Sequence, residues 1–316
     1  MGLLSVALAT ICACTAVTGA NQLTKTDECF CDAGADTTDA FEAPPSCNER
    51  APTAWSAPKK LDALTAPGTS SAPVDPYVLP DGLTLFFTAV DATSTHSRIF
   101  FASRAGRADP FAAGTPLAGL ETLGDKDLKE PALENLRELI FASEGDLWVA
   151  TRPSPADAVK PTKYPPGDLN TPDAEGAPTV SAHGELRMVF VRTKTGERSR
   201  LFEARRSDPS PGGAWSDVTD LTLLNGAGYD LTCPALSPDG LTLFYASNSG
   251  EPAGTSIYVA RRPKLDATFN PPEVVKALSV TGKTSCPRAI TDDGCEIYLT
   301  NDSSGARASY VAARGP

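Results

Sequence analysis

Two aspartates in this sequence have the type and spacing to support hydrolytic chemistry. Asp127 and Asp230 each stand four residues before a proline that recurs along the chain, Pro131 and Pro234. Because equivalent positions of a repeat project to the same side of a fold, both carboxylates are expected at one rim, as ligand contacts. A pair of carboxylates can hydrolyse a glycosidic bond, one as acid and one as base or nucleophile. The alternative is that both are solvated loop acids or contacts of a weakly held cation.

Other catalytic groups are scarce. A nucleophilic serine, threonine or cysteine needs a base within hydrogen-bond reach, commonly a histidine, and the chain has only His96 and His183. Both fall in polar turn or loop sequences. The sequence therefore predicts no catalytic triad, no zinc site and no cofactor.

The charge balance argues against one class of partner. Lys and Arg number 28 against 39 Asp and Glu, a net charge of -11. Nucleic-acid binding draws most of its affinity from cationic contacts to phosphate, so nucleic acid is excluded as a partner.

The first twenty residues form an apolar run ending in small residues, which is typical of a secretory signal. Within it, Ile11-Cys12-Ala13-Cys14 is similar to a bacterial lipobox, so Cys14 is a candidate for lipidation. Cleavage after Ala20 is equally open. Any membrane attachment is expected only through this N-terminal lipid.

The cysteine content favours an oxidising compartment. Residues 21–50 are polar and rich in Asp, without apolar periodicity, and are expected to be a disordered tether before a folded domain at 51–316. If Cys12 is removed and Cys14 carries lipid, six cysteines remain, which can pair in 15 ways. They are Cys29, Cys31, Cys47, Cys233, Cys286 and Cys295.

A repeated motif predicts the fold. Five apolar stretches end in Ala-x-Arg, with their arginines 48, 54, 56 and 52 residues apart, a spacing that suits a four-stranded blade. A Pro-Asp-Gly turn and a second apolar segment precede the closure, as in Leu79–Gly82 and 83–87. Further upstream each repeat has a proline at which an innermost strand would begin. The closing arginines are Arg104, Arg152, Arg206, Arg262 and Arg314, and the prolines are Pro76, Pro131, Pro178, Pro234 and Pro287.

The ends of the chain predict how the ring closes. The fifth repeat has no room for a fourth strand after Arg314, whereas the segment 55–64 resembles the fourth-strand segments at 215–218 and 269–278. The expected fold is therefore all-β, a five-bladed β-propeller of four-stranded blades in which an N-terminal strand completes the last blade. A degenerate sixth blade within residues 21–50 remains the alternative.

The repeat is similar to the TolB-like, WD-related propeller repeat of bacterial envelope proteins. The resemblance lies in Ser-Pro-Asp-Gly-Leu-Thr-Leu-Phe-Tyr at 237–245 followed by Ser-Ile-Tyr-Val-Ala-Arg-Arg at 256–262, and the repeat it concerns extends over 51–316. It implies an exported or envelope location and use of the scaffold for contacts with another protein.

Two functions follow from these observations. The main expectation is a monomeric, non-enzymatic envelope propeller, held by lipid, that binds another envelope protein or a glycan. The alternative is a carbohydrate-active hydrolase that uses acidic residues at the channel of the propeller.

Overall fold

The structure is a computed structural model that describes Cys47 and residues 54–314, apart from 168, 182–184, 209, 227, 250–253 and 303–304. The predicted signal sequence, the lipidation site Cys14, most of the predicted tether and His183 lie outside the described residues. Within the described part, no helix is long and apolar enough to cross a membrane.

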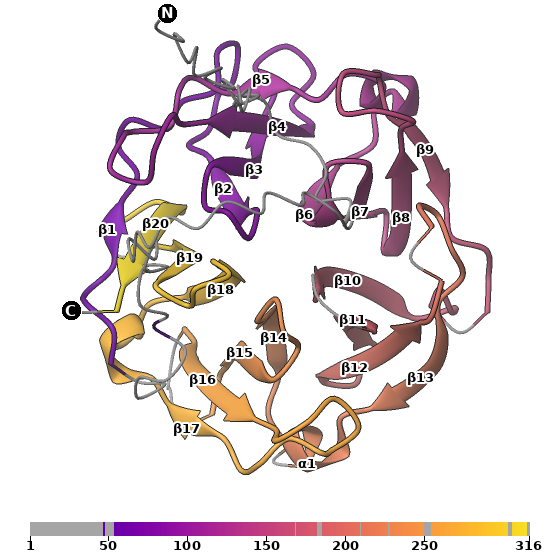
Figure 1. The fold of residues 1–316 in the computed structure, drawn as a ribbon, viewed down its shortest axis with the longest axis vertical. Helices are drawn as coiled ribbons and strands as arrows, with labels where there is room; N and C mark the ends of the chain where they lie inside the picture. Colours follow the sequence, from indigo (N-terminus) through magenta and orange to yellow (C-terminus); the bar gives the residue numbers. More distant parts are fainter. Residues whose placement is uncertain are drawn as a thin grey trace, which may run out of the picture. The chain divides into compact units, whose positions relative to one another are not determined.

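Five antiparallel sheets of four strands stand around a central axis as the blades of a propeller (Figure 1). This confirms the predicted fold. The blades, from the innermost strand outward, are β2 (Val74–Val78), β3 (Thr84–Val90), β4 (Ser97–Ser103) and β5 (Thr115–Pro116); β6 (Lys129–Asn135), β7 (Glu138–Ser143), β8 (Asp146–Thr151) and β9 (Lys160–Lys163); β10 (Ala174–Val180), β11 (Leu186–Thr193), β12 (Ser199–Arg206) and β13 (Ser216–Asp220); β14 (Leu231–Leu236), β15 (Thr242–Ser247), β16 (Ser256–Arg261) and β17 (Glu273–Val274); and β18 (Ser285–Ile290), β19 (Glu296–Asn301), β20 (Ala308–Ala313) and β1 (Lys59–Lys60).

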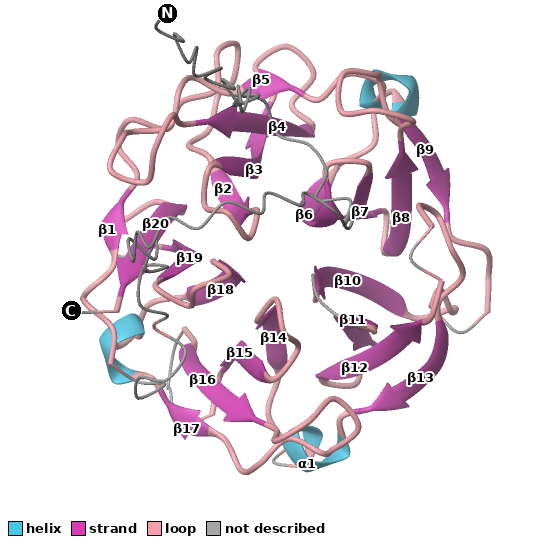
Figure 2. Ribbon diagram, in the orientation of Figure 1, coloured by secondary structure: helices cyan, strands magenta, loops and turns pink. Residues whose placement is uncertain are grey.

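The helices are few and short, and they lie at the outer edge of the ring (Figure 2). They are the 3-10 helices η1 (Leu120–Leu123) and η2 (Lys276–Leu278) and the single turn α1 (Thr222–Asn225). The interior of the ring is therefore built from strands alone among the described residues.

Each recurring sequence feature has one structural place. The repeat prolines lie in the innermost strands, the aromatic and aliphatic segments form the second strands, and Ala-x-Arg ends the third strands. Second strands are covered on both faces by neighbouring blades, which explains their continuous apolar sequences. In β3, for example, Leu85, Phe86 and Phe87 are all buried.

The Asp-Gly turns owe their form to backbone chemistry. Leu83 donates its backbone N–H to Asp81 Oδ1 at 2.8 Å, and Gly82 has a φ of 76°, which a residue with a Cβ adopts at a cost. The turn at Asp239 and Gly240 repeats this geometry. These aspartates are thus explained by the hairpin between the first two strands.

Three of the arginines that close the repeats pair with a carboxylate of a neighbouring blade. Arg206 Nη1 lies 2.6 Å from Glu138 of the preceding blade, and Arg262 lies 2.7 Å from Glu203. Both pairs are buried. Arg104 makes the same kind of contact with the last blade, at 2.9 Å from Glu296.

The ring closes through the N-terminal strand. β1 pairs with β20, and Trp55 forms a β-bridge with Arg314, so the predicted fourth strand of the last blade is confirmed. In Figure 1, β1 and β20 lie side by side although they come from opposite ends of the chain. This arrangement protects the last blade from presenting a bare sheet edge.

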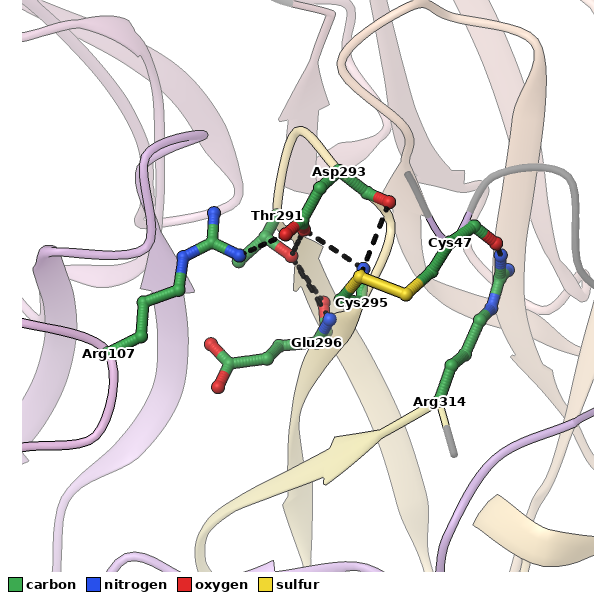
Figure 3. The surroundings of a disulfide bond; sticks show 7 residues. All are labelled: Cys47, Arg107, Thr291, Asp293, Cys295, Glu296 and Arg314. Atoms are coloured by element: carbon green, nitrogen blue, oxygen red, sulfur yellow. Dashed lines mark hydrogen bonds and ion pairs between the residues drawn. A yellow bond between two sulfur atoms is a disulfide. The ribbon is translucent and has the colours of Figure 1, made fainter. Parts of the chain in front are cut away.

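A disulfide reinforces this closure (Figure 3). Cys47 is bonded to Cys295 over a sequence separation of 248 residues, and its carbonyl accepts a hydrogen bond from Arg314 Nη1 at 2.6 Å. On the same turn, Asp293 pairs with Arg107 of the first blade. The two ends of the ring are therefore joined covalently and electrostatically.

A second disulfide links the innermost strands of the last two blades, between Cys233 of β14 and Cys286 of β18. The expectation of disulfides is confirmed. Disulfides persist in oxidising surroundings, so this is an exported protein.

Candidate active site

One position on each innermost strand faces the axis at the same end of the ring. It is the residue before the repeat proline, and in the first four blades its backbone has a left-handed φ between 48° and 57°. A shift of strand register at this place in each of these blades marks a β-bulge, which redirects the side chain. From blade to blade the position holds Asp75, Glu130, Ala177, Cys233 and Cys286.

Glu130 reaches across the axis. Its Oε2 accepts the backbone N–H of Ala177 in the next blade at 2.6 Å, and its Oε1 lies 3.9 Å from Arg288 Nη1 on β18. A Cβ on Gly176 would come within 3.0 Å of Oε2, so the carboxyl group lies against a position that has to be small. A side chain of the second blade that approaches both the third and the fifth lies at the centre of the ring.

Asp75 is the neighbouring carboxyl, one blade before Glu130. It is 7% exposed, and its backbone N–H donates to Thr300 Oγ1 of the last blade at 2.8 Å. Its Oδ1 lies 3.9 Å from Arg307 Nη2. Asp75 therefore sits where the first and last blades meet.

The two carboxyl groups interact electrostatically. Burial raises the pKa of Glu130 above its ordinary value; Arg288 opposes this shift, and the negative charge of Asp75 adds to it. The repulsion between the two negative charges favours the protonated form of Glu130, which keeps its proton to higher pH than a solvated glutamate. Glu130 is therefore suited to act as a proton donor.

A pocket of about 400 Å³ opens beside Glu130, between the second and third blades. Its wall includes Ser143, whose buried hydroxyl has no hydrogen-bond partner among the described residues. Other members of the wall are His96, Asp127, Glu130, Glu175 and Gly176. Such a hydroxyl can donate a hydrogen bond to a polar group that enters the pocket.

Glu175, another acid of this pocket, is held by hydrogen bonds and an ion pair. Its Oε1 accepts Thr171 Oγ1 at 2.6 Å and Arg192 Nε at 2.7 Å, and its side chain is fully buried. These bonds fix the carboxylate as an ion-paired wall residue and occupy its oxygens.

The opposite end of the axis is closed. Apolar side chains from all five innermost strands surround a cavity of about 10 Å³, room for one water at most. Burial raises the pKa of Tyr77 in this group to about 12, so its hydroxyl stays neutral. The group comprises Tyr77, Val78, Leu133, Val180, Leu236, Ala289 and Ile290. Access to the carboxyls is therefore from one face.

The two aspartates singled out from the sequence occupy equivalent places, each capping the third strand of the preceding blade. Asp127 Oδ1 accepts the N–H of Ser97 at 2.8 Å, which lowers the pKa of Asp127, and Asp230 Oδ1 accepts the N–H of Ser199 at 3.0 Å. Asp127 lines the pocket beside Glu130. No described hydrogen bond or ion pair joins Asp127 to Asp230, and their role as ligand contacts stays a prediction.

Asp75, Glu130, Glu175 and Arg288 were missed in the sequence. The signal was available, because the repeat prolines were recognised and the residues before them read Asp, Glu, Ala, Cys and Cys. Acids directly before the repeat proline in two successive blades, Asp75 and Glu130, indicate the site better than acids three residues further upstream, such as Asp127. The described residues hold no group of three or more His, Cys, Asp or Glu suited to a metal ion.

Comparison with known proteins gives a result at the level of the fold. No family model matches the chain. No curated protein matches its sequence. The chain shares its fold with glycoside hydrolases. An α-L-arabinofuranosidase from Podospora anserina, solved with cellotriose, is similar at a TM-score of 0.52 with 13% identity, over 83% of this chain and 96% of that one.

Two further solved structures agree. The catalytic domain of a family 62 α-L-arabinofuranosidase from Coprinopsis cinerea has a TM-score of 0.53 with 10% identity, over 83% of this chain and 97% of that one. An exo-β-1,3-galactanase from Phanerochaete chrysosporium has a TM-score of 0.50 with 11% identity, over 80% of this chain and 65% of that one. At such identities the likeness concerns the fold.

These comparisons correct the main functional expectation. A non-enzymatic envelope binding propeller was predicted because the sequence offered no convincing catalytic set. The propellers that this chain resembles are hydrolases, and the acids that the structure places at the axis are Asp75 and Glu130 rather than Asp127 and Asp230. The alternative prediction, a carbohydrate-active hydrolase, agrees better with both.

Proposed function

We propose that this protein is a carbohydrate-active hydrolase whose working groups are Glu130 and Asp75. The observation that carries the proposal is Glu130, a carboxyl group that lines the pocket and has a raised pKa, to which the negative charge of Asp75 contributes. Environments that separate two carboxyls into a protonated and an ionised member are what acid and base catalysis requires.

The chemistry assigned to the pair is that of a glycosidase. Glu130 donates its proton to the glycosidic oxygen as the bond breaks, and Asp75 acts from the other side, as base towards water or as nucleophile. Glu175, held by Arg192, shapes the pocket, and the unpaired hydroxyl of Ser143 is a donor for a sugar hydroxyl. A pocket of about 400 Å³ is of the size of small-ligand sites.

The location proposed for this activity is the bacterial envelope, with Cys14 as the site of a lipid anchor. The resemblance of the repeat to the TolB-like type supports this location. We expect the protein to act as a monomer, with a glycan as its substrate. Replacement Cys14→Ser is expected to release the protein from membranes. Unchanged membrane retention of that variant would contradict lipidation and leave the hydrolase proposal intact.

The test is release of reducing ends from a panel of polysaccharides and oligosaccharides by the purified protein. Glu130→Gln and Asp75→Asn keep the shape of each side chain and remove its acid function. Each is expected to lower turnover by at least about a hundredfold, as loss of a general acid or base does. Circular dichroism of the variants checks that the propeller remains folded.

Matched controls separate the central pair from other acids. Asp62→Asn removes an exposed surface carboxylate and is expected to keep full turnover. Asp127→Asn and Asp230→Asn test the rim aspartates, and a loss confined to these two would move the reaction away from Glu130. Absence of turnover on every glycan of the panel would contradict the proposal.

A further inference from the structure

Arg288 presents a buried cation at the axis. Its side chain is 1% exposed, and none of its three guanidinium nitrogens makes a hydrogen bond with a described residue. The nearest described carboxylate oxygen is Glu130 Oε1, at 3.9 Å, beyond hydrogen-bond length. A buried guanidinium, always charged, is costly unless oxygens satisfy it, so this arrangement calls for an oxygen ligand.

The neighbours of Arg288 show where it lies along the propeller axis. It lies 3.9 Å from Glu130, which lines the pocket, and the next two residues of β18, Ala289 and Ile290, belong to the apolar group that closes the far end of the axis. Arg288 therefore lies between the pocket and that closure. Glu130 is the pocket residue beside which a bound ligand comes close to Arg288.

Two cations stand beside the two carboxyl groups at the axis. Arg288 lies 3.9 Å from Glu130, and Arg307 lies 3.9 Å from Asp75. The neighbouring carboxylates of the pocket wall are already paired, Asp127 with Lys129 at 3.5 Å and Glu144 with Lys126.

We propose that Arg288 is a carboxylate receptor, and that the sugar bound at Glu130 and Asp75 carries an acid group, as in a uronic acid. This inference rests on the proposed hydrolase function and names its substrate class. A guanidinium presents its N–H groups in a planar fork that matches a carboxylate with two parallel hydrogen bonds. The acid group of the sugar supplies the oxygens that Arg288 lacks.

A sulfate ester is the other common anionic substituent of glycans, and it shares the negative charge. Its tetrahedral oxygens match the planar fork less closely than a carboxylate does. Neutral sugars offer only hydroxyls, which satisfy the hydrogen bonds of a guanidinium without balancing its charge. The three classes are therefore distinguishable by binding.

The experiment is isothermal titration calorimetry of the full-length exported protein with D-galacturonate, D-galactose and D-galactose 6-sulfate. Galacturonate is expected to bind at least about tenfold more tightly than galactose, the size of one charged hydrogen bond. Arg288→Gln is expected to remove that difference and to leave galactose binding within about twofold. Arg198→Gln, which removes an exposed arginine paired with Asp230, is the control for net charge.

Because a buried arginine is replaced, a second variant guards against misfolding. Arg307→Gln changes a side chain that is 55% exposed and is expected to weaken galacturonate binding by about threefold through loss of charge alone. Equal binding of galacturonate and galactose to the wild type would overturn the receptor role, as would preference for the sulfate. Hydrolysis of neutral glycans alone would also overturn it while upholding the proposed function, whereas galacturonate binding without any hydrolysis would overturn the proposed function.

Discussion

Among single residues, Glu130 is the one whose surroundings set its chemistry. Glu130 accepts a backbone hydrogen bond from Ala177 and lies against Gly176. Its carboxyl group interacts electrostatically with Arg288 and Asp75. Asp127, four residues before the same proline, instead caps a strand and pairs with Lys129. Two acids three positions apart in sequence thus differ in state because one faces the axis and the other faces a strand end.

The raised pKa of Glu130 predicts how stability depends on pH. Its ordinary pKa is 4.5, and the folded state keeps the proton to higher pH, so the folded chain binds more protons than the unfolded chain over this interval. The free energy of unfolding should therefore fall as pH rises from about 4.5 through the raised pKa. Glu130→Gln cannot ionise, and its stability should depend less on pH there.

Urea denaturation between about pH 4 and pH 8 measures this difference. The amide oxygen of Gln can still accept the N–H of Ala177, so the variant should be at least as stable as the wild type at the upper end. Glu197→Gln, on the exposed pair with Lys194, is the control. Parallel pH curves for wild type and Glu130→Gln would show that Glu130 titrates normally.

At the scale of strands and blades, the interior is held by ion pairs that cross between sheets. Arg206 and Glu138 are both buried, and Arg206 also stacks on Trp215 with its guanidinium carbon 4.7 Å from the ring centre. In three of the five repeats the arginine of Ala-x-Arg thus joins its blade to a neighbouring one.

Glu138→Ala is expected to destabilise the propeller by about 3–5 kcal/mol, because it leaves the charge of Arg206 buried without its carboxylate. Glu197→Ala removes a carboxylate from an exposed pair and should change stability by less than about 1 kcal/mol. Chemical denaturation of both variants gives the comparison. Equal, small losses would mean that water reaches Arg206 in the folded protein.

The same scale explains what the sequence could predict. Strands recur with their turns and closing arginines, so the blade number, the strand order and the role of the segment at 55–64 were all predictable. The site was harder, because a β-bulge decides which residue faces the axis, and a bulge has no clear signature in sequence. Asp75 and Glu130 became visible only when the bulged positions of adjacent blades were placed together.

At the scale of the whole molecule, the ring has to be closed for the axis to hold a site. Asp75 lies between the first and last blades, where β1, the Cys47–Cys295 disulfide and the Arg104–Glu296 pair join the ends of the ring. Opening this seam would separate Asp75 from Thr300 and Glu130 from Arg288, both of the last blade. Closure and activity are therefore expected to be lost together.

Trp55→Ala tests the seam. Trp55 is 7% exposed, stacks under Arg314 at 4.5 Å and meets Phe244 edge-on, so the variant should lose about 3–5 kcal/mol of stability although it lies near the start of the folded domain. Trp55→Phe keeps an aromatic ring and should lose clearly less. A loss below about 1 kcal/mol in Trp55→Ala, by thermal or chemical denaturation, would show that the ring closes without it.

The pH profile of kcat/KM on the best substrate of the panel shows whether Glu130 delivers the proton in glycan hydrolysis. The rate of the wild type is predicted to fall as pH rises through a pKa above 4.5, where Glu130 loses its proton, and Glu130→Gln is predicted to lose both the rate and this limb of the profile. A Glu130→Gln variant that retains the wild-type rate and profile would contradict the account.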